Sequence, residues 1–221
     1  MKSFCTTPFI ALVLWSVTAN GAQDTPPSWR GQSGSTLEQW TFAANSLTPA
    51  PDTVSNPYGT PTLSISPEPV FATGWYDTFV AYGTNQGFWD IARGSMSLQV
   101  PNSNTGDLYQ YIQVQVTYWL DISQAPTFSF SPSATQIGST ATTLVSDPAG
   151  PGAWYSDLST WLIQPSPNQD MITLLGGSAN GSVIDFVSVD TLATSVPEPS
   201  AVVLATLGGL GLLLVLRRHR R

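Results

Sequence analysis

The longest regular alternation of apolar and polar side chains runs from Leu108 to Leu120, in the sequence LYQYIQVQVTYWL. Apolar side chains at positions 108, 112, 114, 116, 118 and 120 fall on one face together with Gln110. Tyr109, the remaining glutamines and Thr117 fall on the other face. Such alternation is typical of a β-strand with one face in the core and one in solvent. We therefore predict a long, half-buried strand here, near the centre of a sheet.

Shorter apolar runs of the same kind surround this strand along the chain. They cover 38–43, 62–66, 87–91, 95–100, 127–131, 141–145, 171–175 and 183–190, and Gly, Pro and Asn turns separate them. A short helical turn near 154–162 is the one exception that the pattern suggests. Many short strands with such turns predict an all-β fold, an antiparallel β-sandwich that is jelly-roll-like.

The first residues have the pattern of an export signal. Lys2 precedes the apolar run Pro8–Val17, and small residues follow, which places cleavage after Ala19 or Ala22. The apolar run is too short to span a membrane. We therefore predict a signal peptide over 1–22, a β-sandwich domain over 23–191 and a linker over 192–199.

A second apolar segment, Ser200–Leu216, contains seven Leu, three Val and no charge. As a helix it reaches about 25 Å, enough to cross a slightly thinned bilayer. The arginines that follow are retained on the cytoplasmic side; they are Arg217, Arg218, Arg220 and Arg221. The pattern predicts a single transmembrane helix over 200–216, a cytoplasmic tail over 217–221 and a body outside the cytoplasm.

The tripeptide Pro197-Glu198-Pro199, the apolar segment and the terminal arginines together resemble the PEP-CTERM sorting signal. That family occurs in bacteria that make exopolysaccharide. The resemblance implies recognition of the tripeptide by an exosortase, a membrane-embedded processing enzyme that removes the helix. An ordinary single-pass anchor with a proline spacer is the alternative.

The distribution of charge and of reactive side chains excludes several functions for the exported body. Between Ala22 and Val196 there are two arginines and thirteen acids, a net charge of −11, which disfavours nucleic acid as a partner. Cys5 and Lys2 lie in the signal peptide and His219 lies in the tail. Cysteine, lysine and histidine chemistry is therefore not available to the body, and we expect no enzymatic activity.

Carboxylates remain as candidates for chemistry. A glycosidase would need a pair of them, and the least turn-like are Glu38, Glu68, Asp77, Asp90 and Asp121. No cofactor is expected, except that oxygen ligands can hold a structural calcium. If the first and last strands are neighbours, Glu38 approaches Asp185 or Asp190, which makes these three the candidate calcium ligands.

Aromatic residues beside acids are the candidates for binding a glycan, because a ring can stack on a sugar while a carboxylate accepts its hydroxyls. The candidates are Trp75, Tyr76, Trp89, Trp154 and Tyr155, although such rings more often belong to the core. Trp29 and Trp40 are assigned to packing. The segment IDFVSVDT from Ile184 resembles the closing strand of bacterial jelly-roll ligand-binding modules.

Together these features predict an exported protein that is anchored in the membrane at least transiently and then reaches the cell surface or extracellular matrix. The expected partners are the general secretion machinery, an exosortase-type membrane enzyme and exopolysaccharide. A carbohydrate-binding module of the cell surface is the second hypothesis, and a carboxylate-pair glycosidase is the third.

Overall fold

The computed structural model describes residues 24–70, 73–78, 86–103, 106–121, 123–146, 152–177 and 180–195. These residues form antiparallel β-strands and no helix. The strands are β1 (Ser35–Trp40), β2 (Thr53–Ser55), β3 (Thr62–Ser66), β4 (Gly74–Thr78), β5 (Gln86–Ala92), β6 (Ser95–Pro101), β7 (Tyr109–Leu120), β8 (Thr127–Ser131), β9 (Thr135–Ser146), β10 (Ala153–Ile163), β11 (Gln169–Leu175) and β12 (Ser182–Thr194). The predicted all-β, antiparallel class is confirmed.

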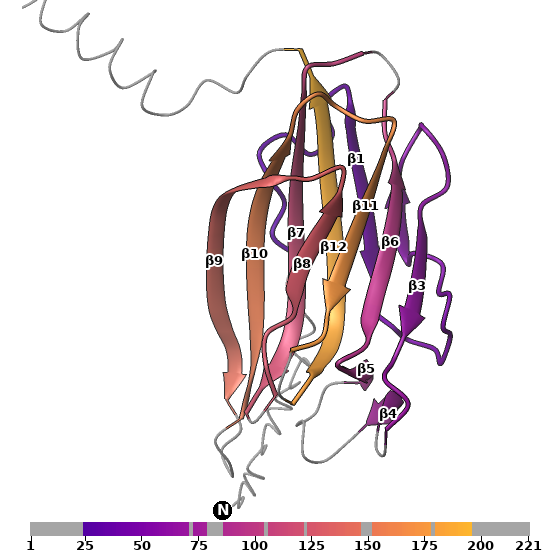
Figure 1. Ribbon diagram of the computed structural model, residues 1–221, viewed down its shortest axis with the longest axis vertical. Helices are drawn as coiled ribbons and strands as arrows, with labels where there is room; N and C mark the ends of the chain where they lie inside the picture. The colour runs from indigo at the N-terminus through magenta and orange to yellow at the C-terminus, as the bar shows by residue number, and fades with distance from the viewer. Residues whose placement is uncertain are drawn as a thin grey trace, which may run out of the picture.

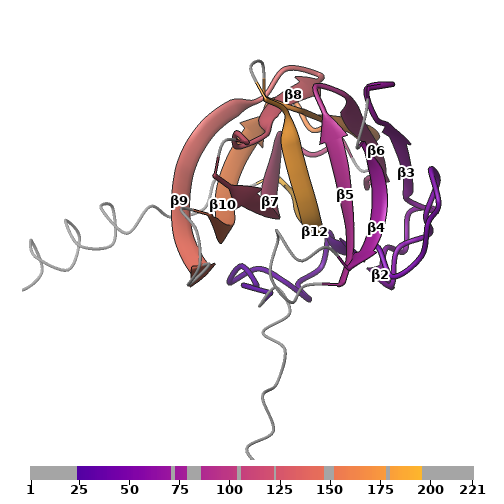
Figure 2. The same cartoon turned by 90° about the horizontal axis from the view of Figure 1, so that it is seen from below.

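The strands form two sheets that lie face to face. The first sheet has the order β2-β1-β12-β7-β10-β9, with β5 also paired to β12 and β4 paired to β5. The second sheet has the order β3-β6-β11-β8. Figure 1 shows the second sheet in front of the first, and the view in Figure 2 shows that the first sheet curves strongly towards β9. The chain passes repeatedly from one sheet to the other.

One hydrophobic core fills the space between the sheets. From the first sheet, β7 contributes Ile112, Val114 and Val116, and from the second sheet Leu98 and Ile172 meet them. All five side chains are fully buried. Burial of one such side chain stabilises the fold by about 1.5–3 kcal/mol, so this shared core is what holds the two sheets together.

The long strand predicted at 108–120 exists, but it is not half-buried. Its predicted inner face is buried from Gln110 to Tyr118, whereas Leu108 lies before the strand and is exposed, and Leu120 is half-buried. The opposite face is buried as well, because the segment before β1 covers it. Gln113 Nε2 donates to the Thr25 carbonyl and the Thr25 amide donates to Gln115 Oε1, both at 2.8 Å. Farther along, Trp29 packs on Tyr111 at 6.0 Å between ring centroids.

Arg30 fixes this covering segment to the last strand. Its Nε and Nη2 donate to the two carboxylate oxygens of Asp190 on β12, at 2.6 and 2.7 Å. The same guanidinium also pairs with Asp24 and lowers the pKa of that carboxyl. Asp190 is 2% exposed, so its charge is buried and depends on Arg30 for compensation.

Most predicted strands agree with the structure, within a few residues at their ends. The segment 154–162, predicted as a helical turn, is instead part of β10, which pairs with β7 on one side and β9 on the other. Pairing with two long strands outweighs the helix-like spacing of its apolar residues. The short strands β2 and β4 were not predicted. Trp40 and Trp29 are buried, as assigned.

The two ends of the chain lie outside the described residues, and with them the predicted signal peptide, Pro197-Glu198-Pro199, the helix over 200–216 and the terminal arginines. Strand β12 continues to Thr194, where it pairs with Tyr109, and so extends past the predicted boundary at 191. In the part of the chain that the structure describes, no helix is long and apolar enough to cross a membrane.

The ion pair of Arg30 gives a stability prediction. The substitution Arg30→Gln leaves the Asp190 carboxylate buried without its partner. We expect a loss of about 3–5 kcal/mol in the free energy of unfolding, measured by urea denaturation with tryptophan fluorescence.

Arg93→Gln is the matched control. Arg93 is exposed and pairs with Glu68 at the surface, so we expect little change in the same measurement. Equal stability of both variants and the wild type would contradict the role assigned to Arg30.

Candidate functional site

The candidate glycan-binding aromatics lie on three strands, β4, β5 and β10. Trp89 and Trp154 are each only 2% exposed, so neither offers a ring face to a sugar in this structure. Trp75 lies opposite Trp89 in the β4–β5 pair and donates from Nε1 to the Phe42 carbonyl at 2.7 Å. These three tryptophans therefore serve packing first.

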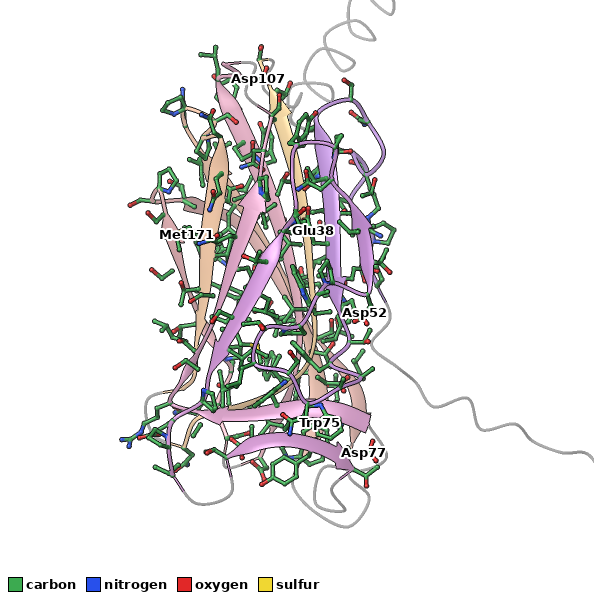
Figure 3. The ribbon with its side chains drawn as sticks, turned by 90° about the vertical axis from the view of Figure 1, so that its right-hand side faces the viewer. Glu38, Asp52, Trp75, Asp77, Asp107 and Met171 are labelled. Carbon is green, nitrogen blue, oxygen red and sulfur yellow. The ribbon has the colours of Figure 1, made fainter. Side chains whose placement is uncertain are left out.

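The two tyrosines keep partial exposure, but they lie on separate clusters. Tyr76 stacks on Phe88 at 5.6 Å between centroids, and Phe88 in turn meets the edge of Trp154 at 5.8 Å. Tyr155 stacks on Tyr118 at 6.1 Å and packs against the main core. The five candidates thus divide between core packing and two half-buried tyrosines. Figure 3 shows Trp75 at one end of the body, near Asp77.

The carboxylates proposed for a glycosidase lie in different surroundings. Glu68 pairs with Arg93 at the surface. Asp90 and Asp121 accept backbone amides two residues ahead, those of Ala92 and Ser123, at 2.9 and 2.7 Å, as turn-capping carboxylates do. Asp77 is exposed on β4, whereas Glu38 lies inside the body, as Figure 3 shows.

The three candidate calcium ligands do not converge on one point. Strands β1 and β12 are neighbours, as the calcium hypothesis required, and Leu37 lies opposite Asp190 while Glu38 lies opposite Val189. Opposed residues share a face and successive residues alternate, so Glu38 and Asp190 point to opposite faces of the sheet. Asp185 sits at a register shift in β12, beyond the residues that pair with β1. Among the described residues no three acidic, histidine or cysteine side chains group as a metal site would require.

Glu38 instead belongs to a polar network inside the body, which the sequence analysis did not anticipate. Its carboxyl accepts from Asn56 Nδ2 at 2.8 Å and from the Thr36 hydroxyl at 3.3 Å. The Thr36 and Thr191 hydroxyls are 2.9 Å apart, which carries the network from β1 to β12. These polar groups satisfy one another where the apolar core ends.

Asn102 connects this network to a second buried acid on the other sheet. Its Oδ1 accepts from Thr191 Oγ1 at 3.2 Å and from Gln110 Nε2 at 3.1 Å. Its Nδ2 donates to Asp170 Oδ2 at 2.7 Å. Asp170 lies on β11, so one chain of hydrogen bonds joins the two sheets from Glu38 to Asp170.

The surroundings of both acids shift them towards their protonated forms. Burial raises the pKa of Glu38 to about 8, against the opposing effect of its bonds to Asn56 and Thr36. Burial likewise raises the pKa of Asp170 to about 7, against its bond to Asn102. Both side chains are 0% exposed, so a substrate cannot touch them in the folded body. We therefore assign the network a structural role in which the stability of the fold depends on pH.

These raised pKa values predict a pH-dependent stability. Between the ordinary carboxyl pKa and the raised values, the folded protein binds protons that the unfolded chain releases, so stability falls as pH rises from about 5 to about 9. One pKa unit corresponds to about 1.4 kcal/mol, which makes the contribution of Glu38 a few kcal/mol. The variant Glu38→Gln should reduce this decline, measured by urea unfolding across that range.

Glu68→Gln is the control for that experiment. Arg93 lowers the pKa of Glu68, which is therefore ionised throughout the range and adds no slope there. An unchanged decline in Glu38→Gln would show that Glu38 is ionised in the folded protein and would refute the prediction.

The other feature of functional interest lies where the body ends. Ser195 follows β12 directly, and its hydroxyl donates to Asp107 Oδ1 at 2.7 Å. Figure 3 places Asp107 at one end of the long axis of the body. The last described residue of the chain therefore lies at that end of the body.

Comparison with known proteins assigns the segment that follows. The model of the PEP-CTERM protein-sorting motif matches residues 195–221, and no curated protein matches the chain. The motif implies processing by an exosortase, which is a membrane enzyme, and with it export and membrane anchoring before cleavage. The chain is therefore a β-rich protein that ends in a PEP-CTERM sorting motif, which begins at the residue after β12.

Proposed function

We propose that this protein is a non-enzymatic component of the cell surface or extracellular matrix, associated with exopolysaccharide. The match of the sorting motif to residues 195–221 carries this proposal. In this proposal an exosortase recognises Pro197-Glu198-Pro199 and releases the body from its membrane helix. The general secretion machinery delivers the body to the outside, after removal of the signal peptide.

The architecture of the body supports a binding or scaffolding role rather than catalysis. We infer a jelly-roll-like sandwich, since the strand order β1-β12-β7-β10 and the repeated passage between sheets are the pattern of such folds. Of the acids considered for catalysis, Glu38 is fully buried and therefore inaccessible to a substrate, and so is the further buried acid Asp170. A surface or matrix role needs none of that chemistry.

A glycan-binding module remains the second hypothesis, but the described aromatics favour it less. Trp89 and Trp154 are core residues, which leaves Trp75, Tyr76 and Tyr155 as the partly exposed rings among the candidates. A stacking platform generally uses several rings along one surface. We therefore propose an association of the protein with the exopolysaccharide layer without assigning a binding groove on the body.

Processing at the motif is tested by the mass of the mature C-terminus from native cells. We expect a chain that ends near Pro197–Pro199, and the variant Glu198→Gln should keep the full terminus at Arg221. Glu68→Gln is the matched control, because it makes the same change at a surface ion pair and should be processed normally. An intact Arg221 in the wild type would favour a plain anchor and overturn the processing proposal.

The association with exopolysaccharide is tested separately by fractionation. We expect the processed protein to sediment with extracted exopolysaccharide and to be released when that polymer is digested. Cells that make no exopolysaccharide should lose the protein to the medium. Retention of the protein on such cells would contradict the association while leaving the processing result unaffected.

A further inference from the structure

Strand β9 forms an unusual edge of the first sheet. Among the described residues it pairs with β10 alone, and Figure 1 shows it at the margin of the molecule with no strand beyond it. At twelve residues it is also the longest edge strand that the structure describes. The other outermost strands are short: three residues in β2 and five each in β3, β4 and β8.

Both faces of β9 are open to solvent, as well as its free edge. Every residue from Thr135 to Thr143 is exposed, and Ile137 is 52% exposed. Strands usually owe their stability to one buried face, which this segment does not have. Leu144 is its one described residue that packs against a core cluster. In Figure 2, β9 stands at the outer margin of the curved sheet.

Two of the usual protections against edge pairing, charge and proline, are missing from β9. Its sequence, TQIGSTATTLVS, contains no charged residue and no proline. Natural edge strands are generally kept apart by lysine, by proline or by their short length. The shifts in the β9–β10 register fall at Ile137 and Leu144, so the ladder between Gly138 and Thr143 is regular. This regular segment is about as long as a typical strand.

We propose that the β9 edge binds the β9 edge of a second copy of this protein, as an antiparallel pair centred on Ala141. An extended strand is the occupant that satisfies a row of free amide and carbonyl groups. Antiparallel self-pairing is symmetric, so each copy offers the other the same edge and no further partner is needed. The pair would continue the first sheet from one molecule into the next.

The absence of charge favours contact between two copies through β9 over contact through the rest of the surface. The body carries a net charge of −11, which opposes contact between two copies, whereas β9 contributes none of that charge. In the centred register Ala141 lies opposite Ala141 of the second copy, and Thr140 lies opposite Thr142. Small and β-branched side chains of this kind are good cross-strand neighbours.

The expected affinity is modest. A single pair of strands of this length buries less than the roughly 1,600 Å² of a standard stable interface. We therefore expect dimers to form as the concentration rises, which suits a protein packed into a surface layer.

The test uses the protein purified from native cells, with whichever C-terminus it carries, and the mass of that terminus is a separate readout of the proposed processing. Analytical ultracentrifugation from about 10 µM to about 1 mM should show a monomer that becomes a dimer. The double variant Thr140→Lys, Thr142→Lys places like charges across the pair and should weaken association at least about tenfold.

The control is Gln99→Lys, Ser129→Lys, which adds the same charge at exposed positions of the second sheet and should dimerise like the wild type. Hydrogen exchange is the second measurement, because the β9 amides should become protected at high concentration even if a variant folds poorly. A wild type that stays monomeric at about 1 mM, or a lysine variant that dimerises as well as the control, would overturn the proposal.

Discussion

The fold depends on the pairing of the last strand with the first. Strand β12 lies between β1 and β7, and the contact from Arg30 to Asp190 joins residues 160 positions apart in the sequence. Long-range pairing of this kind costs loop entropy that only the completed core repays. The body is therefore complete only when the residues immediately before the sorting motif are in place. Ser195 is both the last described residue of the body and the first residue of the sorting motif.

The sequence was informative wherever one face of a strand meets solvent. Alternation located β3, β6 and β8 because their outward side chains are polar. The same reasoning failed for β10, where Trp154, Leu158 and Trp161 suggest a helical spacing that pairing with β7 and β9 overrides. It also assigned the glutamines of β7 to solvent, since the covering segment that holds them comes from a distant part of the chain.

The candidate sites also differ in whether local or long-range information identifies their residues. The sorting motif is read by a partner as a short contiguous stretch, so its residues could be recognised in sequence. The polar network around Glu38 depends on which residues face each other across β1, β12 and β11, and the sequence could suggest only that β1 and β12 meet. The register then decides whether two acids share a face, and it separates Glu38 from Asp190. Burial determines whether an aromatic ring can contact a glycan, and a local pattern of rings beside acids does not reveal which rings are buried.

The position of the last described residue, at one end of the body, bears on when the proposed pairing can form. Strand β9 runs along the long axis, and β12 ends at the tip of that axis (Figure 1). Two molecules whose β9 strands run antiparallel have their tips at opposite ends. Where tethered molecules stand the same way up on one bilayer, that arrangement cannot form. Severing the tether therefore frees each molecule to turn over, so anchorage itself would postpone assembly until the protein has left the membrane.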